Sequence, residues 1–99
     1  MPQGFASPAE DDLDVPLNLH KYVVQHPAAT FFVRMVGDAM EEHGIYDGDI
    51  LVIDRSLTPK KDSIVMAVVD GEFVVRLFQE LEAGSEVWGV VTKVIHYLT

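Results

Sequence analysis

The sequence contains no cysteine, which excludes disulfide bridges and thiolate metal sites. Basic residues are also few: seven Lys and Arg stand against sixteen Asp and Glu, giving a formal net charge of −9. Because the largest basic cluster is the pair Lys60-Lys61, no face is available to release counterions from a phosphate backbone. We therefore expect no direct binding of nucleic acid, and any role on DNA would come through a protein partner.

We also expect neither a targeting segment nor a membrane-spanning segment. The first residues, MPQGFASPAEDD, have neither the basic nor the apolar region of a signal peptide. No apolar run approaches the roughly 18 residues that are needed to cross a membrane. Together with the lack of cysteine, these features predict a cytoplasmic protein with no membrane partner.

The composition that remains is that of a small globular protein. The 99 residues are 48% hydrophobic, which is enough for one domain with one core. Residues 1–12 are rich in Pro, Gly, Ser and acids and predict a flexible N-terminal arm, and residues 13–99 predict the folded domain. We expect no cofactor and no metal, because the four histidines lack the spacing of a zinc site. They are His20, His26, His43 and His96.

Short β-rich runs separated by turn residues dominate the domain. Asp70-Gly71 between two such runs is the strongest short-range signal of a hairpin. Asp38–His43 is expected to form a short helix, capped by Asp38 and stopped by Gly44. Six strands and one helical turn over 20–25 predict a mainly β fold, either a curled, mostly antiparallel sheet or a small barrel. The strands are expected over 13–19, 30–36, 50–53, 63–69, 72–78 and 87–98, the last bent at Gly89.

An ordered set of motifs runs through these segments. Gly-Phe-x-Ser-Pro begins at Gly4, and Gly37-Asp38-x-Met40 lies near the middle of the chain. Between and after them come QHPAATFFV over 25–33, IYDGDILVID over 45–54 and VDGEF over 69–73. Taken together, the motifs resemble the C-terminal domain of the LexA/UmuD self-cleaving peptidases (peptidase S24), and most closely its UmuD members. The resemblance covers residues 4–78 and returns at 89–91.

The resemblance identifies the positions of a catalytic pair. In that family a serine between Gly-Asp and Met is the nucleophile, and a lysine in the strand after Asp-Gly-Glu-Phe removes its proton. These positions hold Ala39 and Arg76 here, and the resemblance makes Gly37, Asp38 and Met40 the turn that holds the oxyanion. Alanine has no oxygen to deprotonate, and arginine stays protonated in proteins. We therefore predict no autoproteolysis.

Simpler explanations exist for both residues. Ala39 could simply begin a helix, because alanine is the best helix former. The flanking Gly37-Asp38 and Met40 favour the family's nucleophile position instead. Arg76 could be a solvated charge on an edge strand, and this interpretation stays open beside the catalytic one. In an alternative alignment, the family's lysine has no counterpart in this chain, and Arg76 lies next to the missing position. The chain lacks a catalytic base in this alignment as well.

Two further departures concern the length of the chain. The family cleaves before the Gly of Gly-Phe-x-Ser-Pro, which would be the bond Gln3–Gly4, so the chain resembles the processed form. Relatives carry about twenty more residues between the base-bearing strand and the last strand, so the domain is expected to be shortened between 79 and 87.

The resemblance also implies a function and partners. It implies an inactive accessory subunit of the SOS response: a homodimer that binds an error-prone, UmuC-like Y-family DNA polymerase and the RecA filament during translesion synthesis. Two alternatives stay open, a Ser-Lys autopeptidase whose nucleophile and base were substituted, and the dimerisation domain of a LexA-type or phage-type repressor. The dimer is expected to pair through the last β-rich segment, at Val87, Trp88, Val90, Val91 and Val94.

Overall fold

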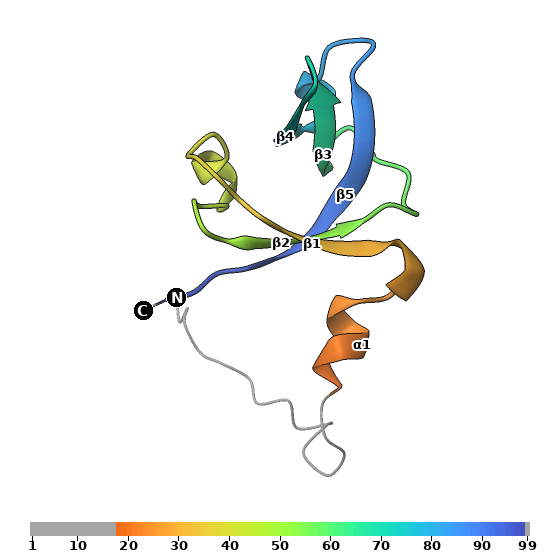
Figure 1. Cartoon of the computed structure of the whole chain (residues 1–99), viewed down its shortest axis with the longest axis vertical. Coiled ribbons are helices and arrows are strands. Elements are labelled where there is room, and N and C mark those ends of the chain that lie inside the picture. Colours follow the sequence, from red (N-terminus) through yellow and green to blue (C-terminus); the bar gives the residue numbers. More distant parts are fainter. Residues whose placement is uncertain (1–17, 99) are drawn as a thin grey trace, which may run out of the picture.

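One five-stranded antiparallel sheet forms the fold in a computed structural model that describes residues 18–98 (Figure 1). The strands are β1 (Thr30–Arg34), β2 (Ile50–Asp54), β3 (Ile64–Val69), β4 (Glu72–Leu77) and β5 (Glu86–Ile95). One α-helix, α1 (Leu19–Val23), precedes them, and three 3-10 turns connect them: η2 (Pro27–Ala29), η3 (Glu41–His43) and η4 (Phe78–Glu80). The mainly β class with one short helix is confirmed, although the α-helix is α1, where a helical turn over 20–25 was expected, and not the segment 38–43.

The long strand β5 gives the sheet its curl. The strand order is β1-β2-β5-β3-β4, so β1 and β4 are the edges. The first half of β5 pairs with β3 and the second half with β2. Figure 1 shows β5 passing from the β3–β4 pair into the β1–β2 pair, which runs in a different direction. The curled sheet is thus the form that the described residues adopt.

Two bulges bend β5. The β3 register passes from Gly89 to Val87 and leaves out Trp88, and the β2 register passes from Lys93 to Val91 and leaves out Thr92. An extra residue of this kind bends a strand and increases its twist. Gly89 lies between the bulges, where an added Cβ would be 2.5 Å from Cγ2 of Ile53. The bulges thus bend the strand on either side of Gly89, and the contact with Ile53 leaves no room for a side chain at this position.

The hairpin between β3 and β4 confirms the turn predicted from Asp70-Gly71. Both residues have positive φ, 52° for Asp70 and 81° for Gly71. Two consecutive positive φ angles define a type I′ turn, whose twist matches that of the flanking strands.

The core joins the strands to the loop between β1 and β2. Met40 and Ile45 are loop residues of this core that flank η3, and they are 2% and 1% exposed. Their burial anchors the loop against the sheet on either side of η3. The other buried members of the cluster are Met35, Leu51, Ile53, Met66 and Val75.

Two local expectations differ from the structure. Leu19, placed at the end of a predicted strand, begins α1, where Oδ1 of Asn18 caps the helix by accepting the N–H of Lys21 at 3.1 Å. Asp38 is not a helix cap, because the helix is a single 3-10 turn that begins after Met40. Asp38 contributes its backbone carbonyl to the N–H of Glu41 instead.

One further local expectation is confirmed, and several others concern residues outside 18–98. Gly44 ends η3 in the left-handed conformation, as expected. The N-terminal arm, the rest of the strand predicted over 13–19, and the bond Gln3–Gly4 lie outside the described residues. No helix within 18–98 has the length and apolar character needed to cross a membrane.

Candidate functional site

Ala39 lies at the tip of the loop between β1 and β2. The base of the loop is closed by two hydrogen bonds: Met35 N–H donates to Asp49 O (2.7 Å), and Gly48 N–H donates to Met35 O (2.8 Å). The N–H of Gly37 donates to Oδ1 of Asp47 at 2.7 Å. The side chain of Ala39 is therefore held at the surface by a loop that is tied down on both sides.

The N–H of Gly37 is already used within this loop. Its acceptor is the carboxylate of Asp47, so the same N–H is not free to hold an oxyanion. Met40, the third residue of the predicted oxyanion turn, is a core residue whose carbonyl accepts the N–H of His43. Within residues 37–40, the Gly37 N–H and the Met40 carbonyl thus already have partners inside the loop.

Arg76 lies on β4 opposite Val65 of β3. Its Nη1 donates to the carbonyl of Val75 at 2.7 Å. Arg76 and Ala39 line the same cleft, which has a volume of about 380 Å³. The structure thus brings together the two positions that the motifs assigned to a nucleophile and a base.

The rest of the cleft lining is almost entirely apolar. It comes from the end of β1 and the residues after it, from β3, and from the middle of β4. Arg34 and Arg76 are the only charged members of this lining among the described residues, and no Ser, Thr, Cys, His or Lys belongs to it. The apolar members besides Ala39 are Val33, Met35, Val36, Met66, Phe73, Val74 and Val75.

An aromatic cluster connects the two sheet edges beside the cleft. The ring of Trp88 lies 5.1 Å from that of Phe31 on β1 and 5.7 Å from that of Phe73 on β4. The guanidinium of Arg55 stacks on Trp88 at 4.2 Å, and its Nε donates to the Trp88 carbonyl at 2.8 Å. These contacts fix the positions of β1 and β4 relative to each other.

The residues predicted for a dimer interface all lie on β5, which pairs within the chain. Its first half is bonded to β3 and its second half to β2, so β5 is an interior strand of the sheet. Val90 is buried, whereas Val94 is 36% exposed and its neighbour Ile95 is 49% exposed. The side of Val91–Ile95 that faces away from β2 has no strand partner among the described residues.

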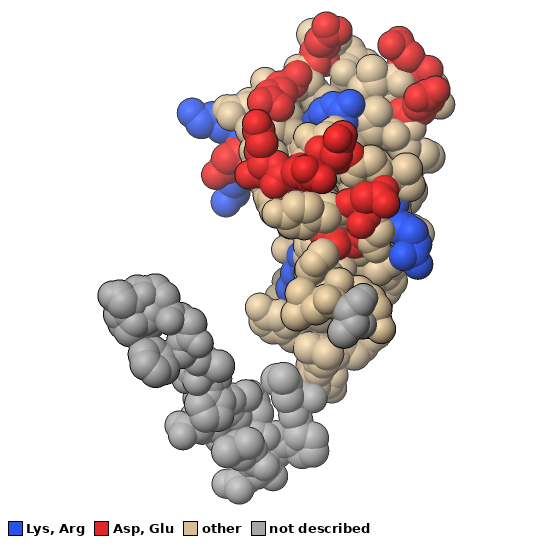
Figure 2. Space-filling model, turned by 90° about the vertical axis from the view of Figure 1, so that its left-hand side faces the viewer, with Lys and Arg blue, Asp and Glu red and all other residues tan. Residues whose placement is uncertain are grey.

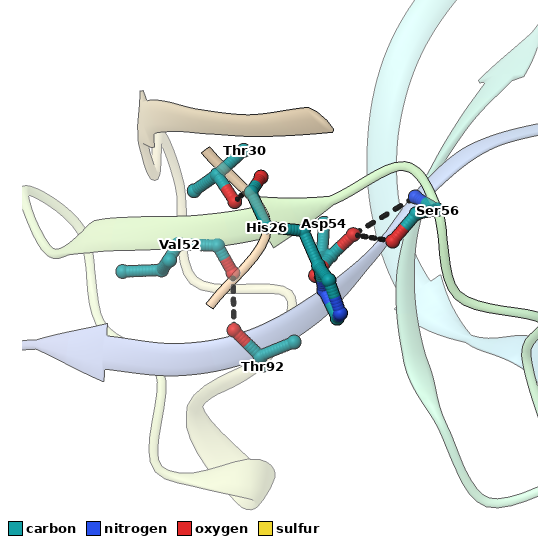
Figure 3. A network of polar contacts seen from close by, with 6 residues as sticks. All are labelled: His26, Thr30, Val52, Asp54, Ser56 and Thr92. Carbon is teal, nitrogen blue, oxygen red and sulfur yellow. Dashed lines mark hydrogen bonds and ion pairs between the residues drawn. The ribbon is translucent and has the colours of Figure 1, made fainter. Parts of the chain in front are cut away.

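The sequence interpretation missed a buried carboxylate at the end of β2. Asp54 accepts hydrogen bonds from the N–H and Oγ of Ser56, at 2.8 and 2.6 Å, and lies 2.5 Å from Nδ1 of His26 (Figure 3). Burial by itself raises the pKa of Asp54, but the hydrogen bonds from Ser56 and His26 outweigh it, and the net pKa is lowered. This network joins η2 to the loop after β2.

A second buried carboxylate lies just before β2. Oδ1 of Asp49 is 2.5 Å from Nδ1 of His96, and Oδ2 accepts the N–H of Tyr46 at 2.8 Å. The hydrogen bond from His96, followed by that from Tyr46, lowers the pKa of Asp49. No group of three or more potential metal ligands is found within 18–98.

Comparison with known proteins adds a family and several relatives. A family model described as Peptidase S24-like matches residues 1–88. MucA of Escherichia coli is 52% identical over 73 residues, which cover 74% of this chain and 50% of MucA. SamA of Salmonella typhimurium is 47% identical over 78 residues, which cover 79% of this chain and 56% of SamA. The chain thus spans about half the length of these curated relatives.

ImpA of Escherichia coli aligns with more of the chain. It is 40% identical over 111 aligned residues, which cover 94% of this chain and 77% of ImpA. The alignment is longer than the 99 residues of this chain, so ImpA contains residues that have no counterpart here.

Proposed function

The chain belongs to the Peptidase S24-like family, and from this premise we propose that it is a catalytically inactive, UmuD-like accessory subunit of the SOS response. The observation that carries the proposal is the shared cleft of Ala39 and Arg76. Both positions of the family's catalytic pair face this cleft, and neither side chain can take part in proton transfer.

The chemistry of peptide cleavage explains why the cleft would be inactive. A nucleophile must lose a proton as it attacks the carbonyl carbon, and a nearby base must accept that proton. Ala39 offers only a methyl group, and the guanidinium of Arg76 remains protonated. The described lining supplies no substitute hydroxyl, thiol, imidazole or amine. The function that remains for this domain is binding.

The proposed partners are a second copy of the chain, an error-prone Y-family DNA polymerase and the RecA filament, all in the cytoplasm. The similarity to MucA, SamA and ImpA supports a role of this kind. The net charge of −9 supports indirect action on DNA, because the chain would be held there by proteins rather than by phosphates. Exposed Val94 and Ile95 support a dimer that forms along the second half of β5.

Co-purification with a tagged Y-family polymerase, combined with sedimentation, tests this function. We expect a dimer that is retained by the polymerase and is not retained by the tag alone. A matched variant with Val94→Glu and Ile95→Glu should lose both the dimer and the retention if the dimer is the binding form. A monomer that captures no polymerase would overturn the proposal and leave only the family assignment.

A further inference from the structure

The outer edge of β4 has no strand partner in the described part of the chain. β4 is the last strand in the sheet order, and the chain passes from it through η4 to β5 without forming another strand. Phe78 N–H donates to Ser63 O, and backbone groups alternate in direction along an antiparallel strand. Phe73, Val75 and Leu77 therefore direct their N–H and C=O groups to the free edge. An edge of this kind can bind another strand.

One acidic and one basic side chain lie on this edge strand. Glu72 is the first residue of β4 and is exposed, and Arg76, further along the strand, is half-buried. Their even spacing places both side chains on the same face. Both ion pairs found within 18–98 join a histidine to an aspartate, so neither Glu72 nor Arg76 meets an opposite charge there. Both charges are therefore available to a partner strand.

An antiparallel copy of β4 complements this arrangement. With a two-fold axis beside Val74, each residue of β4 faces the residue that lies equally far on the other side of Val74 in the second copy. Phe73 then faces Val75, and because both direct their backbone groups outward, they form a hydrogen-bonded pair. Glu72 faces Arg76 in a non-hydrogen-bonded pair, where side chains lie closest, and the symmetry repeats this contact.

We propose that two copies of this chain associate edge to edge through β4, with Val74 at the two-fold axis and two Glu72–Arg76 ion pairs across it. The Nη1 atom of Arg76 donates to the Val75 carbonyl at 2.7 Å in the single chain. Pairing of the edges transfers this carbonyl to the N–H of Phe73 of the second copy and turns the guanidinium toward a carboxylate. The surface is separate from the second half of β5, so the inference goes beyond the proposed function.

The distribution of charge selects this edge and this occupant. The other edge strand, β1, carries Arg34 and no Asp or Glu, so an antiparallel copy of β1 would gain no ion pair. Figure 2 shows that Asp and Glu gather over the upper part of one face of the molecule, with few Lys or Arg among them. This excess, with a net charge of −9, opposes nonspecific contact between two copies. Two ion pairs at fixed positions offset the repulsion and set the register of the strands.

Disulfide cross-linking on the full chain tests the inference. The chain has no cysteine, so Val74→Cys supplies one thiol in each copy, and the two-fold axis brings the two thiols together. We expect a mild oxidant to link two copies through residue 74. A contact of one strand pair is small, so this should require a higher concentration than the dimer on β5. Lys60→Cys, an exposed thiol in a loop, is the matched control and should link much more slowly.

Charge reversal in the Val74→Cys background tests the register. Glu72→Arg and Arg76→Glu each place like charges opposite one another, so each should slow the cross-linking at least about tenfold. An equimolar mixture of these two variants restores both opposite-charge pairs. The mixture should therefore regain the parent rate, and mass spectrometry should find the product that contains one copy of each.

Three results would overturn the inference. The first is cross-linking of Val74→Cys that is no faster than that of Lys60→Cys. The second is an unchanged rate in Glu72→Arg and Arg76→Glu. The third is a mixture of these two variants that links no faster than either alone, which would show that their effects do not arise from a contact with each other. Polymerase capture does not use these variants, so failure here would leave the proposed function to its own test.

Discussion

Nδ1 of His96 lies 2.5 Å from Oδ1 of Asp49, and this contact connects the end of β5 to the loop that carries Ala39. The other carboxylate oxygen of Asp49 accepts the N–H of Tyr46 in the same loop, and the ring of Tyr46 lies 5.6 Å from that of His96. The position of Ala39 therefore depends on a contact made by the last strand of the sheet. Changes at the C-terminal end of the domain should alter the cleft.

The first prediction concerns pH and the two buried aspartates. The folded-state pKa values of Asp49 and Asp54 are lowered, while the unfolded value is about 3.9. Between the lowered folded pKa values and the unfolded pKa, the unfolded state therefore binds more protons than the folded state. The stabilisation is fully present above about pH 4 and is lost as the pH falls through the lowered folded pKa values.

Urea unfolding at a series of pH values between neutrality and strong acid measures this effect. Asp54→Asn cannot titrate at this position, so its free energy of unfolding should fall less steeply on the acid side than that of the parent. Asp62→Asn, in an exposed loop, serves as the matched control. Parallel pH profiles for the parent and Asp54→Asn would contradict the assignment.

The second prediction concerns the close approach of Gly89 and Ile53. A Cβ at position 89 would lie 2.5 Å from Cγ2 of Ile53, a completely buried side chain. Gly89→Ala should lower the free energy of unfolding by about 1–3 kcal/mol, the usual cost of overpacking. In an Ile53→Ala background, which removes the clashing methyl group, the same substitution should cost less. Equal costs in the two backgrounds would show that the steric explanation is wrong.

Local signals in the sequence were sufficient for most of the fold. Asp70-Gly71 predicted the hairpin because these two residues favour the positive φ angles of its turn. Gly44 predicted the end of η3 because glycine favours the left-handed conformation that ends a helix. A curled sheet was one of the two predicted forms, but the bulges at Trp88 and Thr92 were not predictable, because they arise only when β5 pairs with two different strands. The same pairing makes β5 an interior strand of the sheet, which no local pattern in the sequence indicated.

The candidate site was only partly predictable. The motifs identified Ala39 and Arg76, and the structure places both in one cleft. The two histidine–aspartate pairs gave no comparable signal, because their members are 28 and 47 residues apart in the sequence. A histidine far from its partner has no local pattern that distinguishes it from a solvent-exposed one.

The third prediction tests the ancestry of the cleft. The double variant Ala39→Ser and Arg76→Lys should acquire slow cleavage of a supplied peptide that spans the sequence around Gln3–Gly4. The reason is that the apolar lining favours a neutral lysine, which could then accept the serine proton. Mass spectrometry of the products measures the effect, and each single variant is the control. Cleavage by the parent chain would contradict the proposed inactivity.

The fourth prediction concerns the second half of β5 as the dimer surface. Val94 and Ile95 are exposed, and the side of the strand away from β2 has no strand partner among residues 18–98. Burial of a carboxylate without a partner is strongly unfavourable, so Val94→Glu should raise the dimer dissociation constant at least roughly tenfold. Sedimentation at several concentrations measures this constant. Val36→Glu, an equally drastic change at a position that is 82% exposed on another element, should leave it unchanged. A dimer that survives Val94→Glu but is lost in Val36→Glu would show that the interface lies near the end of β1, beside the cleft, and not on β5.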